Sequence, residues 1–349
     1  MSTGEGAVGR GPSSCRRRPR RLALPPALFP LVLLAGCGPM SPLDPESEPA
    51  RRISVLWWAM LALATIVFGG ACVMLIVGWF RRREWGLPVL GERPRLFDGS
   101  VVVFGIVIPV VVLVALFAWA NVAMVQETDS PPANSPAMKI EVTGSQWWWQ
   151  VRYPGTTAVT ANEIHIPART PVTIVTEAED VIHSFWIPRL NRKVDSLPGH
   201  ANRVELYAEK PGYYRGSCAE FCGQQHARMG VAVYADPPER FRAWLATMSR
   251  PRAAPASPLA RRGEQVFMSK QCASCHTIRG TPARGEVGPD LTHLKTRSTL
   301  AALTIPNRRG YLAGWVADPQ SVKEGAKMPA LDLTGPELQA LLEYLESLK

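Results

Sequence analysis

Two long apolar runs set the strongest limit on how this chain of 349 residues can fold. Neither Ile53 to Phe80 nor Val101 to Val125 contains a charged residue, and each exceeds the roughly 20 apolar residues that cross a bilayer. Buried helices of a water-soluble core are the weaker interpretation at these lengths. The segment that joins the runs is rich in arginine from Arg81 to Arg95, which predicts a cytoplasmic turn with both flanking ends outside. We therefore expect a two-helix transmembrane hairpin.

The first 36 residues have the order of a secretory signal. A basic stretch from Arg16 to Arg21 precedes an apolar run from Leu22 to Leu34, as in the charged and apolar regions of such signals. The following Leu34-Ala-Gly-Cys37 looks like a bacterial lipobox. By that resemblance, cleavage would leave Cys37 as a lipidated N-terminus, and a retained, uncleaved anchor is the alternative. Lipidation requires an exported N-terminus, which agrees with the orientation predicted for the hairpin.

A short segment beyond the hairpin combines soft metal ligands. Cys218-Ala-Glu-Phe-Cys222-Gly-Gln-Gln-His226-Ala-Arg-Met229 places two thiols, an imidazole and a thioether together, and His183 lies upstream. Thiolate, thioether and imidazole ligands favour copper. A disulfide between the cysteines and a zinc site of two Cys and two His are the alternatives, but neither explains Met229. The ligand set therefore points to copper and to electron transfer.

The residues around this segment resemble subunit II of haem-copper cytochrome c oxidases. The similarity extends from about Arg51 to Trp244. It is carried by the cysteine segment and by three upstream motifs: Asp180-Val-Ile-His183-Ser-Phe-Trp-Ile-Pro188, Lys193-Val-Asp195 and Pro198-Gly199. The resemblance implies a dinuclear CuA centre in a cupredoxin-like, all-β sandwich. It also implies that Trp147 is the residue through which electrons reach the copper.

The family pattern assigns each copper ligand. The implied ligands are His183, Cys218, the backbone carbonyl of Glu220, Cys222, His226 and Met229. Both cysteines would bridge the two copper ions. His183 and Met229 would complete one copper, and His226 with the Glu220 carbonyl would complete the other. The Glu220 carboxylate would in addition face a magnesium site shared with subunit I.

A second cofactor motif lies nearer the C-terminus. Cys272-Ala-Ser-Cys275-His276 has the C-x-x-C-H spacing that attaches haem c, with the histidine as an axial ligand. A redox dithiol or half of a zinc site is the alternative. Gly288-Pro289-Asp290-Leu291 and Lys327-Met328-Pro329 follow in the order seen in small class I cytochromes c. That similarity makes Met328 the second axial ligand, and His/Met ligation suits electron relay.

The sequence thus predicts a multidomain membrane protein: the hairpin, the cupredoxin-like sandwich and an all-α class I cytochrome c domain. The expected boundaries are a signal peptide over 1–36, an N-terminal segment and hairpin over 37–128, a CuA domain over 134–248, a linker over 249–260 and a cytochrome c domain over 261–349. The linker is rich in proline and alanine, a composition typical of a semi-rigid spacer.

Local patterns predict several elements. Aromatic β-formers from Gln146 to Tyr153 should open the first strand of an antiparallel sandwich, although an aromatic belt above the bilayer is an alternative for Trp148 and Trp149. Further strands, helices and a helix-capping box are expected as follows: strands over 171–176 and 203–207, helices over 259–269 and 309–317, and a capping box at Thr334-Gly-Pro-Glu337 before a leucine-rich helix.

Some residues receive no role. His165, His200 and His293 belong to neither motif. Many relatives carry a glutamate for proton uptake near the start of the second span, where this chain has none, and Asp98 is the nearest carboxylate. The net charge of +10 does not indicate nucleic-acid binding, because the basic residues cluster in the signal, the cytoplasmic turn and the linker.

The resemblance implies a caa-type oxidase subunit of a bacterial plasma membrane, with both cofactor domains on the outer face. Electrons would pass from cytochrome c or another donor to the fused haem, then to CuA and to subunit I. This chain has no oxygen-reducing site of its own, so oxygen would be reduced to water in subunit I. That reaction would be coupled to proton translocation. Subunit III and membrane lipid are further expected partners. The alternatives are a CuA subunit of a nitric oxide reductase and a lipid-anchored copper storage or delivery protein.

Overall fold

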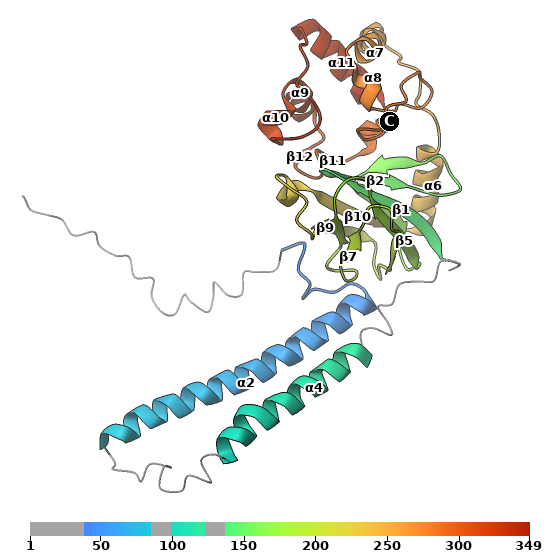
Figure 1. Ribbon diagram of the computed structural model, residues 1–349. Coiled ribbons are helices and arrows are strands. Elements are labelled where there is room, and N and C mark those ends of the chain that lie inside the picture. Colours follow the sequence, from blue (N-terminus) through green and yellow to red (C-terminus); the bar gives the residue numbers. More distant parts are fainter. Residues whose placement is uncertain (1–37, 85–98, 123–136) are drawn as a thin grey trace, which may run out of the picture. The chain divides into compact units, whose positions relative to one another are not determined.

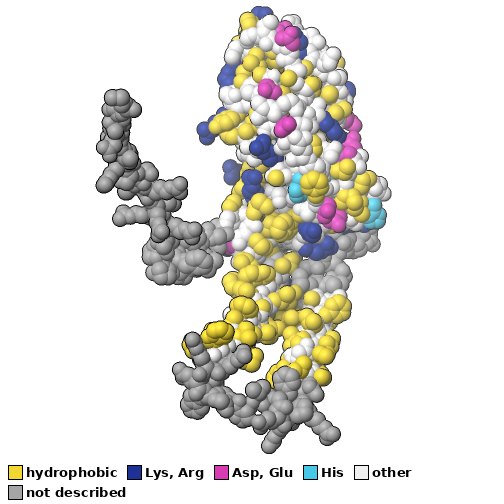
Figure 2. All heavy atoms as spheres, turned by 60° about the vertical axis from the view of Figure 1, so that its left-hand side comes forward, with side chains coloured by type: hydrophobic (Ala, Val, Ile, Leu, Met, Phe, Trp, Pro, Cys, Tyr) yellow, Lys and Arg dark blue, Asp and Glu magenta, His cyan; other side chains and the backbone are white. Residues whose placement is uncertain are grey.

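The computed structural model describes residues 38–84, 99–122 and 137–349. The signal sequence, Cys37 and Asp98 therefore lie outside the described residues. Among the described segments, α2 (Glu48–Glu84) and the pair η3 (Val103–Val107) and α4 (Ile108–Ala120) contain stretches long and apolar enough to cross a membrane. Hydrophobic side chains cover these helices (Figure 2). The predicted apolar helices are thus confirmed, and the last predicted residues of the second span lie outside the description.

Residues 137–248, hereafter the sandwich domain, form two five-stranded sheets (Figure 1). In spatial order the first sheet contains β3 (Val159–Ala161), β2 (Trp148–Arg152), β1 (Met138–Ser145), β5 (Val172–Ala178) and β8 (Asn202–Leu206). The second contains β4 (Glu163–Pro167), β10 (Gly230–Asp236), β9 (Gly212–Cys218), β6 (His183–Trp186) and β7 (Val194–Ser196). Helix α6 (Pro238–Met248) ends the domain and inserts Phe241 and Met248 into the core. The predicted β-sandwich and its strands near residues 172 and 203 are confirmed.

Two details of the predicted sandwich were wrong. The first strand is β1, which alternates exposed and buried residues ahead of the tryptophan segment, so that segment forms β2. The sheets are also not purely antiparallel, because β1 pairs in parallel with β5 and β10 in parallel with β4. Each parallel pair joins strands far apart in sequence, and the crossovers leave no signal in local patterns.

Trp149 belongs to the core of the sandwich domain. Its side chain is fully buried and packs edge-on against His183 and Phe185, with ring centroids 5.8 Å away in both cases. The membrane-interface interpretation is therefore wrong for Trp149. Trp148 is half-buried and lines a cavity facing the C-terminal half of the chain.

Residues 258–349, hereafter the C-terminal domain, are mainly helical. The elements are α7 (Pro258–Ser269), α8 (Cys272–Cys275), η6 (Leu294–Thr296), a small pair of strands β11 (Thr299–Leu300) and β12 (Ile305–Pro306), α9 (Arg309–Ala317), α10 (Pro319–Val322) and α11 (Gly335–Ser347). The predicted capping box is present, since Thr334 and Glu337 exchange hydrogen bonds at the start of α11. Leu341, Leu342 and Leu345 then form part of a buried core with α7.

Residues 249–257 between the two domains contain no helix or strand, but residues 258–260 of the predicted linker already belong to α7. This connecting segment lies against the C-terminal domain. The Arg252 guanidinium forms an ion pair with Glu264 and lies over the Tyr344 ring, 5.8 Å from its centroid. The Arg250 carbonyl accepts a hydrogen bond from His293. The linker therefore has a fixed course on this domain instead of acting as a free spacer.

Candidate metal and haem sites

The candidate copper ligands meet at one end of the second sheet. His183 is the first residue of β6 and Cys218 the last of β9. The loop after Cys218 contains η5 (His226–Arg228) and ends at Met229, directly before β10. The Cys218 amide donates to the Met229 carbonyl across 2.9 Å. This backbone hydrogen bond joins the two ends of the loop. The four candidate ligands on the loop, Cys218, Cys222, His226 and Met229, therefore lie close together.

The distances within this cluster suit a compact metal site. The two sulfur atoms of Cys218 and Cys222 are 3.8 Å apart, and both cysteines are free thiols. Nδ1 of His183 lies 3.9 Å from the Cys218 sulfur, and Nδ1 of His226 lies 3.7 Å from the Cys222 sulfur. The Met229 sulfur is 3.7 Å from the Cys222 sulfur. The structure therefore brings all five candidate side-chain ligands together, and Cys218 and Cys222 form no disulfide.

Hydrogen bonding favours a thiolate in this site, against the effect of burial. The hydrogen bond with the Cys222 thiol, opposed by burial and assisted by His183, lowers the pKa of Cys218 to about 3. The same pairing with Cys218 raises the pKa of Cys222. The two thiols thus share a proton in the metal-free chain. A bound cation would take the place of that proton, because metal ligands must be deprotonated.

Asp180 orients His183. Its carboxylate lies 2.9 Å from Nε2 of His183 and accepts a hydrogen bond from the Gln146 amide at 2.8 Å. Burial alone would raise the pKa of Asp180, but the hydrogen bonds from His183, from two backbone amides and from Lys327 lower it to about 2. The ionised carboxylate holds the Nε2 proton, which leaves Nδ1 free to bind a metal. Such outer partners fix ring orientation and tautomer.

Trp147 contacts the cysteine loop directly. Its indole Nε1 donates to the Cys222 carbonyl across 3.0 Å, and the Gln146 side chain donates to the same oxygen across 2.8 Å. The side chain of Trp147 also lines the cavity that it shares with the C-terminal domain. The structure therefore places this residue between the two candidate cofactor sites.

Glu220 presents its two oxygen-bearing groups differently. Its backbone carbonyl oxygen lies 3.2 Å from the Cys218 sulfur, within the cluster. Glu220 as a whole is exposed to solvent, as is the neighbouring Phe221. The carbonyl is thus positioned for the copper role that the resemblance implies, while the magnesium role of the carboxylate stays a prediction.

The candidate haem ligands surround one cavity of about 210 Å³. Cys272, Cys275, His276 and Met328 all contribute to its wall. Most of the remaining wall is apolar and includes Phe267, Leu291, Leu294, Leu312, Val316, Leu341 and Leu345. Two thiols for thioether bonds, an imidazole, a thioether sulfur and an apolar lining fit a covalently bound haem. The structure therefore supports the haem motif over half of a zinc site.

His276 is held in the state that an axial ligand needs. Its Nδ1 donates to the Pro289 carbonyl across 2.8 Å, which leaves Nε2 as the free ring nitrogen. Burial lowers the pKa of His276 and keeps the imidazole neutral. Gly288 allows this placement, because a Cβ there would lie 2.5 Å from Cε1 of His276.

We expect Gly288→Ala to displace His276 and to cost about 1–3 kcal/mol of stability, as overpacking of a close contact does. Gly310→Ala, in α9, is a matched control because a Cβ there meets no atom within 4 Å. Thermal unfolding of the intact haem-loaded chain, monitored by the visible absorption of the haem, measures both. Equal unfolding midpoints for the two variants would contradict the role of Gly288.

Two of the three histidines without an assigned role have side-chain contacts with protein groups. His165 pairs with Asp236 at 2.7 Å, and both ring nitrogens of the buried His293 face backbone carbonyl oxygens. The sequence analysis missed two charged residues that the structure emphasises. Asp180 was recognised within a motif but without its contact to His183, and Lys323 attracted no notice although it is buried beside Trp147.

Family comparisons agree with this geometry. Residues 156–235 match the family described as cytochrome c oxidase subunit II, periplasmic domain, and residues 260–349 match the cytochrome c family. The first match covers the strands that carry the copper ligands, and the second covers the haem motif.

Relatives match over nearly the whole chain. Cytochrome c oxidase subunit 2 of Alkalihalophilus pseudofirmus is 33% identical over 93% of this chain and 96% of its own length. The Bacillus subtilis protein of the same name is 31% identical over 94% of this chain and 98% of its own length. Among solved structures, the periplasmic domain of subunit II of cytochrome oxidase from Bradyrhizobium japonicum is 29% identical over 34% of this chain and 96% of that domain, with a TM-score of 0.32.

Proposed function

Because the chain belongs to the cytochrome c oxidase subunit II family, we propose that it relays electrons from its own haem c to a CuA centre and onward to subunit I. Family membership makes the chain a component of an oxidoreductase complex that contains subunit I. Its two matched domains imply copper and haem c as cofactors. The proposal adds the order in which these centres act.

One observation carries the proposal. The cavity that contains Cys275, His276 and Met328 is also lined by Trp147, and Trp147 donates a hydrogen bond to the carbonyl of Cys222. A single residue therefore contacts both the haem pocket and the copper loop. Haem c and CuA supply reversible one-electron chemistry when bound. The chain contributes rigid ligation and a short separation between the two sites.

The ligand assignment follows the same arrangement. We propose that Cys218 and Cys222 bridge two copper ions, with His183 and Met229 on one and with His226 and the Glu220 carbonyl on the other. Cys272 and Cys275 would attach the haem, and His276 and Met328 would be its axial ligands. The Glu220 carboxylate would contribute to a magnesium site at subunit I.

The hairpin and partners complete the proposal. Two apolar helices indicate insertion in a membrane, and we propose that both cross it, with the two cofactor domains outside. The further partners are subunit III and a cytochrome c or another external donor. Cys37 would carry a lipid. Oxygen reduction and proton translocation belong to the complex with subunit I. The oxidase names of the relatives favour this function over a nitric oxide reductase or a copper carrier.

The deciding experiment is electron paramagnetic resonance of the intact chain in detergent, with copper and haem quantified. We expect a mixed-valence signal delocalised over two copper ions and one covalent haem per chain. A mononuclear copper signal, or zinc in place of copper, would overturn the assignment of the cysteine loop. Oxygen uptake compared with nitric oxide uptake by the complex with subunit I separates the oxidase from the reductase.

A further inference from the structure

Lys323 of the C-terminal domain is a buried lysine that contacts the sandwich domain, and burial lowers the pKa of its ammonium group to about 7. It follows α10, and its residue surface is 3% exposed. Its Nζ donates to the Trp147 carbonyl at 2.6 Å, to the Arg228 carbonyl at 2.9 Å and to the Ala301 carbonyl at 3.4 Å. An ammonium group has three donors, and two of the three acceptors belong to the sandwich domain. Arg228 lies within the copper loop, and Trp147 contacts that loop.

Glu163 of the sandwich domain makes the reciprocal contact. It lies on β4, is 3% exposed and points at the start of β11. Its carboxylate accepts hydrogen bonds from the Ser298 amide at 3.0 Å, from the Thr299 amide at 2.9 Å and from the Thr299 hydroxyl at 2.8 Å. Every one of these donors belongs to the C-terminal domain. Each domain therefore inserts one charge among polar groups of the other.

Buried charges of this kind define a position more than they add stability. Removing a charge from water is costly unless fixed partners replace the lost hydration. Lys323 and Glu163 recover that cost only in the relative placement where both sets of partners are in reach. A rotated or shifted placement would leave a charge desolvated and unpaired, which disfavours it. The two contacts together thus select one docked arrangement.

The backbone beside Lys323 supports the same conclusion. Ala301, Ala302 and Leu303 all have positive φ, at 51°, 55° and 62°. Residues other than glycine keep this conformation only where their surroundings enforce it. Here Lys323 binds the Ala301 carbonyl, and the Gly230 amide of the sandwich domain donates to the Ala302 carbonyl across 3.2 Å. The turn is therefore shaped by contact with the other domain.

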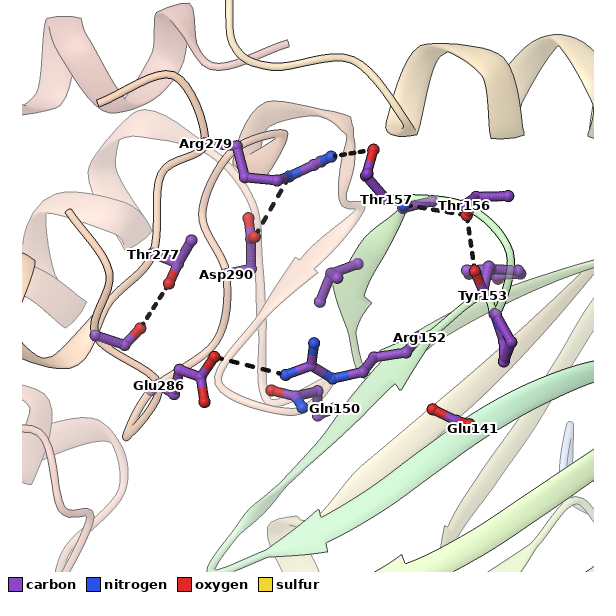
Figure 3. A pocket seen from close by; sticks show the side chains of 15 residues that line it. Glu141, Gln150, Arg152, Tyr153, Thr156, Thr157, Thr277, Arg279, Glu286 and Asp290 are labelled. Atoms are coloured by element: carbon purple, nitrogen blue, oxygen red, sulfur yellow. Dashed lines mark hydrogen bonds and ion pairs between the residues drawn. The ribbon is translucent and has the colours of Figure 1, made fainter. Parts of the chain in front are cut away.

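Further contacts between the two domains lie beside the copper loop and around a cavity. Beside the copper loop, the Gln225 side chain donates to the Glu324 carbonyl across 2.7 Å. Elsewhere the interface opens into a polar cavity of about 390 Å³ (Figure 3). There Arg152 and Glu286 are 3.9 Å apart, and Arg279 contacts the Thr157 hydroxyl at 3.2 Å. Neither Lys323 nor Glu163 lines this cavity.

We propose that Lys323 and Glu163 form a reciprocal charge latch that docks the C-terminal domain on the sandwich domain and holds the haem pocket against Trp147. Both are positioning residues, since neither is a candidate ligand of copper or haem, although Lys323 also contributes to the wall of the haem cavity. The role of the latch in keeping the path from haem to copper short rests on the proposed function. Its existence as a docking contact can be tested separately.

Hydrogen exchange in the intact chain tests the docking. The amides of Ser298, Thr299 and Gly230 donate across the interface. We expect them to exchange about tenfold faster in both Lys323→Met and Glu163→Ala, as local opening becomes easier. The control is Lys295→Met, which removes an ion pair with Glu346 inside the C-terminal domain. Exchange within α7, α11 and the sheets should be unchanged.

Electron transfer tests the purpose of the latch. After photochemical reduction of the haem in the complex with subunit I, haem-to-copper transfer should slow about tenfold or more in both variants, with unaltered haem absorption and copper resonance. Unchanged exchange at the three amides overturns the latch. Faster exchange with an unchanged transfer rate overturns its positioning role. Absence of a copper or haem signal in the wild type would instead refute the proposed function. The difference in hydrogen exchange between the two variants and the control would still test the latch.

Discussion

Cys218→Ser should abolish the dinuclear copper signal and reduce cytochrome-driven oxygen uptake by more than about 100-fold, beyond the effect of losing a supporting contact around a metal. The Cys218 sulfur lies within 3.9 Å of ligand atoms from both Cys222 and His183. A hydroxyl cannot replace a bridging thiolate, because it is a harder ligand that stays protonated near neutral pH. Copper resonance and oxygen uptake of the purified complex measure the two effects.

The matched control is Cys72→Ser. This cysteine lies in α2, away from the ligand cluster, and its substitution should leave copper content and uptake unchanged. The covalent haem should be present in both variants, because its attachment depends on the C-terminal domain. Oxygen uptake by Cys218→Ser at the rate of the control would refute the proposed path through copper.

The double variant Cys272→Ser with Cys275→Ser should give the opposite pattern. Without thiols at the wall of the haem cavity, no thioether bonds can form, and covalent haem should be absent. The copper signal should persist, since its ligands belong to the sandwich domain. We expect cytochrome-driven oxygen uptake to fall by about 100-fold, because without the fused haem the electron must pass directly from the external donor to the copper site. Haem staining after denaturation and copper resonance check both parts.

Ser274→Ala is the control for this variant. Ser274 lies between the two cysteines. Its hydroxyl donates to the Gln271 carbonyl within the same turn and lies 3.8 Å from the Cys275 sulfur. Its loss should spare haem attachment and uptake. Full cytochrome-driven uptake by the double variant would mean that electrons reach the copper without the fused haem, which would contradict the proposed order of the centres.

The sequence was most informative where chemistry depends on local spacing. The haem motif occupies five consecutive residues, and most candidate copper ligands lie in one loop from Cys218 to Met229. Both motifs could therefore be recognised directly in the sequence. The apolar helices and the capping box at Thr334 follow from short-range periodicity for the same reason. The strand β1 was missed because its alternation is short and lies ahead of a more conspicuous aromatic segment.

Contacts between distant segments could not be predicted in this way. Asp180, Lys323 and Glu163 act through partners whose identity depends on the folded chain, and most of those partners are backbone groups. A backbone carbonyl has the same chemistry at every position, so it leaves no trace in the sequence. The parallel pairing of β1 with β5 was hidden for a related reason, since it depends on the return path of the chain.

The arrangement of the sheets has a consequence for the order of biosynthesis. All ten strands of the two large sheets lie between Met138 and Asp236, and the C-terminal domain adds none to them. Domains generally fold as units, beginning with the N-terminal one as the chain emerges. The nascent protein therefore passes through a stage in which the sandwich is complete while Ser298 and Lys323 are still to come. During that interval the Trp147 side of the cysteine loop is uncovered, because the residue that contacts Trp147 and Arg228 from the C-terminal domain has not yet been made.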